Sequence, residues 1–179
     1  MTKLIIRQLK REDAENFREI RLSGLKKNPE MFGSTYEVES QKPIELFIEC
    51  IEKSVIWGAY HAGQIIGVII FLQDTSLKSA HKANIYGFYV EPQFRNQGVA
   101  THLLHAVIDF AKQHVEQILL SVASNNEAAI HLYKKNGFQI YGIEPRALKN
   151  KSNYQDDLLM ILFLESDIKL EMSQHLTTL

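Results

Sequence analysis

The sequence predicts an α+β fold, with a mixed, mostly antiparallel central sheet of about six or seven strands and about four flanking helices. Two observations carry this prediction. Residues 55–61 and 64–73 are apolar, β-branched and aromatic runs separated only by an Ala-Gly pair, which is typical of a β-hairpin. The strand predicted at 84–90 is followed by a helical pattern and then by the apolar run 118–122. A crossover through a helix makes these two strands parallel.

The chain before the hairpin predicts one strand and two helices. Residues 3–9 are rich in isoleucine, and we expect them at the edge of the sheet or second from it. Residues 13–27 predict a helix with acidic residues near its start and lysines at its end, as the helix dipole favours. Gly24 costs this helix about 1 kcal/mol relative to Ala, so it is either a tolerated glycine or a place of close approach. A second helix begins near Pro43.

The segment 30–53, which contains this second helix, is strongly acidic. It holds six glutamates against two lysines, and Leu46, Phe47, Cys50 and Ile51 lie on one side of the helix. The acidic face opposite is either solvated or attracts a cationic amine. Cys50 has no paired histidine motif, so we expect it to pack in the core rather than to act as a nucleophile.

Residues 90–104, VEPQFRNQGVATHLL, combine a strand end, a turn and the start of an amphipathic helix. Pro92 cannot donate to a sheet, so the preceding strand ends near it, and Gly98 supplies a residue without a Cβ where the turn closes. The first amides of the helix, up to Thr101, have no intrahelical partner, and with the helix dipole they favour a phosphate. Ala100 is small enough to let that phosphate approach. Small residues near a helix start also occur for packing alone.

The last third of the chain predicts one more helix and two more strands. The helix spans 126–135, with an asparagine as its N-cap and Gly137 as its stop. The strands are 138–143 and 158–164, joined by a polar loop. In the tail, 166–179, apolar residues recur at i+4 spacing, which favours a final helix.

Composition and charge exclude several classes of protein. The 179 residues are 45% hydrophobic and 23% charged, as in an ordinary globular chain, and the net charge of −1 leaves no electrostatic footprint for nucleic acid. The apolar runs are too short to span a bilayer, and a single cysteine cannot form an intrachain disulfide. We therefore expect a cytoplasmic protein without nucleic-acid or membrane partners. His102 and His105 lack a matching carboxylate or cysteine signature, so no metal is expected, and neither a P-loop nor GxGxxG is present.

Two motifs resemble those of the GNAT superfamily, the acyl-CoA-dependent N-acetyltransferases. The first resembles the cofactor loop of that superfamily and consists, in order, of Val90, Pro92, Arg95, Gly98 and Ala100. The second is NNEAAIHLYKKNGF, in which Ala129 and Tyr133 follow Asn126 by three and seven residues before a terminal GF. Arg95 stands where the superfamily often has Gln, and Ala100 where it often has Gly, both within its range.

The resemblance implies one N-acetyltransferase domain over residues 1–165, which uses acetyl-CoA as co-substrate and needs no metal. It also implies that the parallel strands splay at a bulge and leave a slot for the pantetheine arm, and Gly87 is compatible with that bulge. Lys134 and Lys135 are further candidates for contacts with phosphate. The implied cofactor-binding residues are Phe88, Tyr89, Val90, Arg95, Asn96, Gln97, Gly98, Val99, Ala100, Thr101, Asn126, Ala129 and Tyr133.

The resemblance assigns Tyr133 as the general acid. A primary amine attacks the thioester carbonyl directly, and a phenol that is protonated at neutral pH can protonate the departing thiolate. The amine is itself mostly an ammonium ion, so a base or a water must accept its proton. The first two helices and their link would border the acceptor site, where Glu37 and Glu39 could attract the amine. The candidate bases, chosen because they lie near strand ends, are Glu91, Glu144, Tyr86 and His81.

Several questions stay open at the level of sequence. The alternative to the enzyme is a non-catalytic acyl-CoA-binding sensor or interaction module, against which the intact Tyr133 argues. The acceptor could be a small amine, an amino acid, a polyamine, an aminoglycoside or a protein N-terminus. The oligomeric state is open as well, with a homodimer among the options.

Overall fold

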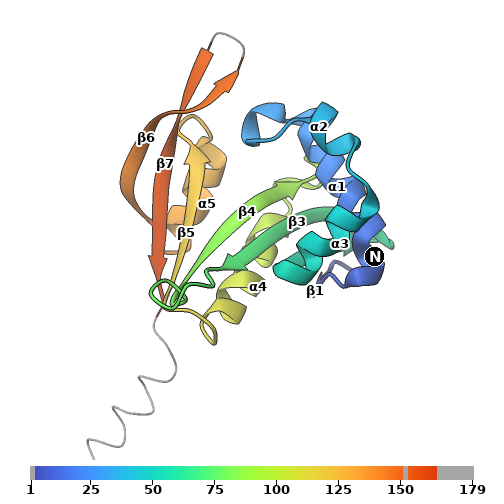
Figure 1. Cartoon of the computed structure of the whole chain (residues 1–179), viewed down its shortest axis with the longest axis horizontal. Coiled ribbons are helices and arrows are strands. Elements are labelled where there is room, and N and C mark those ends of the chain that lie inside the picture. The colour runs from blue at the N-terminus through green and yellow to red at the C-terminus, as the bar shows by residue number, and fades with distance from the viewer. Residues whose placement is uncertain (1–2, 151–152, 165–179) are drawn as a thin grey trace, which may run out of the picture.

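The computed structural model of the chain describes residues 3–150 and 153–164, within which seven strands form one continuous sheet (Figure 1). The strand order is β1-β2-β3-β4-β5-β7-β6, and only β4 and β5 are parallel neighbours. The predicted α+β fold with a mixed, mostly antiparallel sheet is therefore confirmed. The predicted tail, 166–179, and residue 165 lie outside the described residues. The strands are β1 (Ile5–Gln8), β2 (Val55–His61), β3 (Gln64–Gln73), β4 (Lys82–Val90), β5 (Gln117–Ala123), β6 (Gln139–Asn150) and β7 (Asn153–Phe163).

Five α-helices flank the sheet in the described part of the chain. Four of them match the predicted helices, and α2 is additional. It spans five residues, which is too short to show a helical period in the sequence, and Thr35 caps it by accepting a hydrogen bond from Val38 N. The helices are α1 (Ala14–Lys27), α2 (Tyr36–Ser40), α3 (Ile44–Lys53), α4 (Val99–Ala111) and α5 (Glu127–Lys135).

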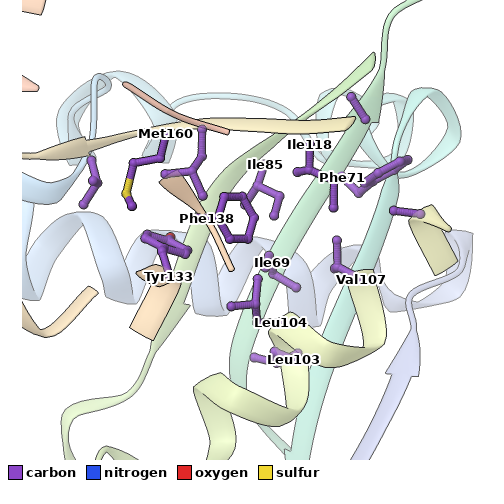
Figure 2. Close-up of a cluster of buried hydrophobic side chains, with 14 of the residues drawn as sticks. Ile69, Phe71, Ile85, Leu103, Leu104, Val107, Ile118, Tyr133, Phe138 and Met160 are labelled. Atoms are coloured by element: carbon purple, nitrogen blue, oxygen red, sulfur yellow. The ribbon is translucent and has the colours of Figure 1, made fainter. Parts of the chain in front are cut away.

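Two hydrophobic clusters fill the space between the sheet and its helices. On one face, α1 and α3 bury Phe17 and Phe47 against β2 and β3. On the other face, α4 buries Leu103 and Val107 in a larger cluster that Tyr133 of α5 also joins (Figure 2). The sheet is thus covered on both faces, and α5 reaches the core through a tyrosine.

The predicted hairpin and the predicted edge strand are both confirmed. β2 and β3 pair antiparallel along their length, and the turn between them places Ala62 and Gly63 at φ angles of 52° and 81°. These left-handed angles suit the right-handed twist of a hairpin. β1 pairs only with β2 and therefore lies at the edge of the sheet.

β4 and β5 pair only at their beginnings. Their parallel register ends at Asn84 and Leu119, although both strands continue well beyond these residues. Opposite Ile69 of β3, β4 carries two residues, Gly87 and Phe88, which form a β-bulge, and Gly87 has a φ of 54° that favours glycine. The expected splay of the parallel pair, and the bulge in β4, are both present.

β6 and β7 form a much longer hairpin than the sequence predicts (Figure 1). The predicted strands covered only 138–143 and 158–164, because the polar stretches between them show no alternation of apolar and polar residues. The backbone groups of these stretches nevertheless pair with each other. A register shift between Glu144 and Leu148 accommodates Pro145, which cannot donate to a regular ladder.

Candidate functional site

A cavity of about 980 Å³ lies where β4 and β5 part. Its walls come from the second half of β4, the starts of α4 and α5, and, on the other side, from α1, the segment 31–34 and the β6–β7 hairpin. The predicted cofactor-binding residues all line it except Gln97, whose Nε2 donates a hydrogen bond to Gln93 O at 2.9 Å. The fold therefore brings the two sequence motifs to one cavity.

The turn before α4 presents a row of unused amides. Gly98 is the N-cap of α4 and has a φ of 80°, and Asn96 also lies in the left-handed region, at 59°. Within the described part of the chain, no hydrogen bond uses the backbone amides from Asn96 to Thr101. Together with the positive end of the helix dipole, these amides fit a diphosphate group.

Arg95 ties this turn to the rest of the protein. Its Nε donates to Val90 O at 3.0 Å and its Nη2 donates to Asn28 Oδ1 at 2.7 Å, while the guanidinium lies over the ring of Tyr89, 5.7 Å from the ring centre. Two of its donor groups are therefore used within the protein. The geometry favours a role in holding the turn to the end of α1 over the direct phosphate contact that the sequence suggested.

Tyr133 lies on α5 between the cavity and the core. Asn126 starts this helix by accepting a hydrogen bond from Ala129 N at 3.2 Å, and Gly137 ends it with a φ of 90°. The ring of Tyr133 packs 6.2 Å from that of Phe88, and burial raises the pKa of its phenol. No described residue forms a hydrogen bond with its hydroxyl group. The hydroxyl group is therefore protonated at neutral pH and available to a ligand.

Of the four candidate bases, only Tyr86 lines the cavity. Glu91 is buried outside the lining and accepts a hydrogen bond from Lys27 Nζ at 2.6 Å, so its carboxylate links β4 to α1. Glu144 and His81 do not line the cavity either. Of the two lysines after Tyr133, the second lines the cavity and the first does not.

The helical wall of the cavity is organised by Arg21 of α1. Its Nε and Nη2 donate to the two carboxylate oxygens of Glu39 at 2.9 and 2.8 Å, and its guanidinium lies 4.8 Å from the ring centre of Phe32. Burial would raise the pKa of Glu39, but Arg21 outweighs burial and lowers it. The charge of Glu39 is thus already compensated, and Glu37 is exposed and outside the lining, so neither matches the expected attraction for an amine.

Gly24 of α1 is a place of close approach, as one of the two sequence interpretations held. An ideal Cβ on Gly24 would lie 3.0 Å from Phe32 Cζ and 3.1 Å from Tyr89 Cγ. The missing side chain lets the Phe32 ring, which lines the cavity, rest on α1.

The strand wall of the cavity carries a polar group that sequence reasoning missed. Ser121 Oγ of β5 donates to Asp157 Oδ2 of β7, and Gln155 Nε2 donates to Asp157 Oδ1, both at 3.1 Å. All three residues line the cavity. Asp156 and Asp157 are adjacent, so no signal in the sequence shows which of them faces the cavity.

A mixed sheet with a turn of unused amides and a splayed slot beside it is the arrangement that an acyl-CoA-dependent transferase requires. The sequence model of the acetyltransferase (GNAT) family matches residues 24–138, and the chain belongs to that family. Acetyl transfer from acetyl-CoA is the reaction of the family, and the chain is an acyltransferase of this kind. The unused amides and the slot fit that donor.

Similarity to individual proteins extends over most of the chain. L-amino acid N-acetyltransferase AaaT of Escherichia coli K12 is 25% identical over 174 residues, 89% of this chain and 98% of that protein. The solved acetyltransferase of GNAT family from Streptococcus pneumoniae has a TM-score of 0.81 at 21% identity, over 91% of this chain and 100% of that chain. The putative acetyltransferase yncA from Salmonella typhimurium, solved with its cofactor acetyl-CoA, has a TM-score of 0.79 at 18% identity, over 91% and 95%. These structures share the fold.

Two features are absent from the described ranges, namely a cluster of metal ligands and a membrane-spanning helix. No group of three or more His, Cys, Asp or Glu side chains is arranged to hold a metal ion within residues 3–150 and 153–164. None of the helices in these ranges is long and apolar enough to cross a membrane.

Proposed function

We propose that the protein acetylates the α-amine of a free amino acid, by direct attack of the amine on the thioester of acetyl-CoA. The observation that carries the choice of a small acceptor is a contact over the cavity. An ideal Cβ on Gly33 would lie 3.7 Å from Leu148 Cδ2, so the segment between α1 and α2 meets β6 above the acceptor side. Because this contact bridges the entrance to the cavity, a small molecule can reach the acceptor side more easily than a residue on the surface of a folded protein. The similarity to AaaT over almost its whole length supports an amino acid.

The cofactor-binding residues have divided roles in this proposal. The amides from Asn96 to Thr101 bind the diphosphate, and Arg95 positions the turn. Beyond Asn84, β4 has no partner on the β5 side, so the backbone of Phe88–Val90 can bind the pantetheine arm. Asn126 and Ala129 border the same slot from α5. Bound acetyl-CoA supplies a thioester carbonyl as the electrophile.

Tyr133 provides the proton that the departing sulfur gains. Because burial raises the pKa of the phenol, Tyr133 holds its proton throughout the neutral range. The proton moves as negative charge develops on the sulfur, and solvent restores it afterwards. The ring contact with Phe88 places the phenol beside the slot.

Arg21 and Lys42 provide the positive groups for the carboxylate of the acceptor. Arg21 Nη1 has no hydrogen-bond partner among the described residues and lies 3.3 Å from the position of an ideal Cβ on Gly87, next to the bulge. Lys42 lines the same cavity. A guanidinium group matches a carboxylate in geometry and charge.

Matched acceptors test this proposal on the wild-type protein. Thiol release from acetyl-CoA is measured with L-leucine, whose side chain suits the apolar lining at Phe32 and Ile70, and with L-leucinamide, in which a neutral carboxamide replaces the carboxylate. We expect kcat/KM to be roughly tenfold or more higher for the acid. An amide that is as good as the acid would contradict the amino-acid assignment. No thiol release with any primary amine, including putrescine, would contradict the function itself.

The cellular location and the oligomeric state of the protein belong to the same proposal. The chain has one cysteine, and Cys50 is a free thiol, which supports a cytoplasmic location that cell fractionation tests. The edge strand β6 exposes Tyr141 and Ile143, which supports a homodimer. The molar mass in solution, measured by light scattering, tests it.

A further inference from the structure

Asp157 differs from the other buried carboxylates of the protein. Within residues 3–150 and 153–164, four acidic side chains are buried, and three of them form an ion pair with a basic side chain. The pairs are Arg7–Asp13, Arg21–Glu39 and Lys27–Glu91. Asp157 is 8% exposed and has no basic partner within the same ranges.

The partners of Asp157 are neutral and do not exhaust its oxygens. Ser121 and Gln155 each donate one hydrogen bond, one to each carboxylate oxygen. A carboxylate oxygen can accept two, so each keeps a free acceptor position. A buried negative charge without a cation is costly, and a ligand cation that binds it recovers that cost. The site is therefore suited to a cation that donates hydrogen bonds.

Asp157 faces the cavity at the level of the β4 bulge. Alternate residues of β7, Gln155, Asp157 and Leu159, line the cavity, as the period of two in a strand requires. The parallel register that ends at Asn84 and Leu119 would, if it continued, set Tyr86 level with Ser121, the partner of Asp157. Asp157 thus stands across the slot from the bulge, where the acetyl group is proposed to lie.

Other titratable groups line the same cavity. Arg21 and Glu39 are already paired with each other, and Glu144, the cross-strand neighbour of Asp157 on β6, lies outside the lining. The remaining titratable groups of the lining come from the other elements around the slot and are Lys42, Cys50, Tyr86, Tyr89, Arg95, His131, Tyr133, Lys135 and Tyr141. Asp157 is the carboxylate among these groups that has no positive partner within the described residues.

We propose that Asp157 binds the ammonium group of the acceptor and takes its proton. The inference rests on the proposed function, whose amine it positions. Asp157 gains one proton and the ammonium becomes an amine. Its nitrogen then bonds to the acetyl carbon as the bond from that carbon to sulfur breaks. Tyr133 gives its proton to the sulfur, and the second proton lost by the nitrogen replaces the one on Tyr133 through solvent. Asp157 later releases its proton to water.

The test compares Asp157→Asn with Asp156→Asn. Both changes remove one negative charge, but Asp156 lies outside the cavity lining and accepts a hydrogen bond from Arg146 N that an Asn oxygen can keep. For Asp157→Asn we expect kcat/KM for L-leucine at pH 7 to fall roughly tenfold to a hundredfold, with KM for acetyl-CoA within about twofold. The loss should shrink as the pH approaches the pKa of the amine, because a neutral amine needs no partner for its charge. Equal rates for the two variants, or a loss that does not change with pH, would overturn the inference.

A binding measurement separates this inference from the proposed function. Protein saturated with coenzyme A is titrated with n-butylammonium and with its neutral analogue n-butanol, so that neither turnover nor an amino acid is required. We expect the wild type and Asp156→Asn to bind the cation roughly tenfold or more tightly than the alcohol, and Asp157→Asn to lose most of this preference. If the wild type binds the cation in this way but acetylates no amine, the proposed function fails, whereas the binding of an ammonium group by Asp157 stands. A wild-type protein without the preference refutes that role, even where Asp157→Asn does not fold.

Discussion

Replacing Tyr133 by Phe removes one hydroxyl group and little else. The ring would keep its contacts with Phe88 at 6.2 Å and Phe138 at 5.5 Å, and no described residue loses a hydrogen-bond partner. We therefore expect the free energy of unfolding to change by no more than about 0.5 kcal/mol. A lost general acid costs about 10²- to 10⁴-fold in rate. We expect kcat to fall at least roughly a hundredfold, with KM for acetyl-CoA nearly unchanged.

Steady-state thiol release and urea unfolding of the same preparations check these two expectations. Tyr60→Phe is the matched control, because Tyr60 is also a buried tyrosine but its hydroxyl group donates to Asp13 Oδ1 at 3.4 Å, on β2 and away from the cavity. This control should lose about 1 kcal/mol of stability and keep its kcat. A kcat for Tyr133→Phe within tenfold of the wild type would refute the role of proton donor. A raised KM for acetyl-CoA at unchanged kcat would reassign Tyr133 to binding alone.

Three further predictions concern the framework of the site. Gly24→Ala should destabilise the protein by about 1–3 kcal/mol, although Ala favours helices, because its Cβ would meet Phe32 and Tyr89 near 3.0 Å; increased stability in urea unfolding would contradict this. Gly98→Ala should raise KM for acetyl-CoA several-fold, because a φ of 80° costs Ala about 1–2 kcal/mol and the turn would relax; an unchanged KM would count against the anion-binding turn. Arg7 lowers the pKa of Asp13 to about 2 from 3.8, so this pair adds at most about 2 kcal/mol of stability above pH 4, which is lost as the pH falls towards 2. The stability difference between wild type and Asp13→Asn, measured by urea unfolding from pH 7 to pH 2, should therefore shrink at low pH, and a constant difference would refute the assignment.

Much of the fold could be predicted because its signals are local. The turn residues of the first hairpin, the asparagine cap and Gly137 stop of α5, and the crossover from β4 to β5 each depend on neighbours in the sequence. Gly24 could be singled out for the same reason, since a glycine inside a helix needs an explanation. The short α2 and the polar halves of β6 and β7 could not be predicted, because pairing and capping rather than a hydrophobic period create them.

The candidate site divides in the same way. The motifs located the turn, the slot and Tyr133, all of which line one cavity. They could not show that Arg95 donates hydrogen bonds to Val90 O and to Asn28. Nor could they show that the side chain of Gln97 donates to Gln93 O and does not line the cavity. Those outcomes depend on which groups long-range packing brings within hydrogen-bond distance.

The sequence by itself determined that this chain has a mixed sheet and a turn of free amides that suits a diphosphate, whereas the splay of the parallel strands was implied only by the family resemblance. Only the tertiary structure decided which charges are neutralised inside the protein and which are left for a ligand. Glu39 and Asp157 look alike in the sequence, as acidic residues in polar stretches, but one meets Arg21 and the other meets only neutral donors. Whether the negative charge of a carboxylate is neutralised depends on the cations around it, and these come from helices and strands that are far apart in the chain.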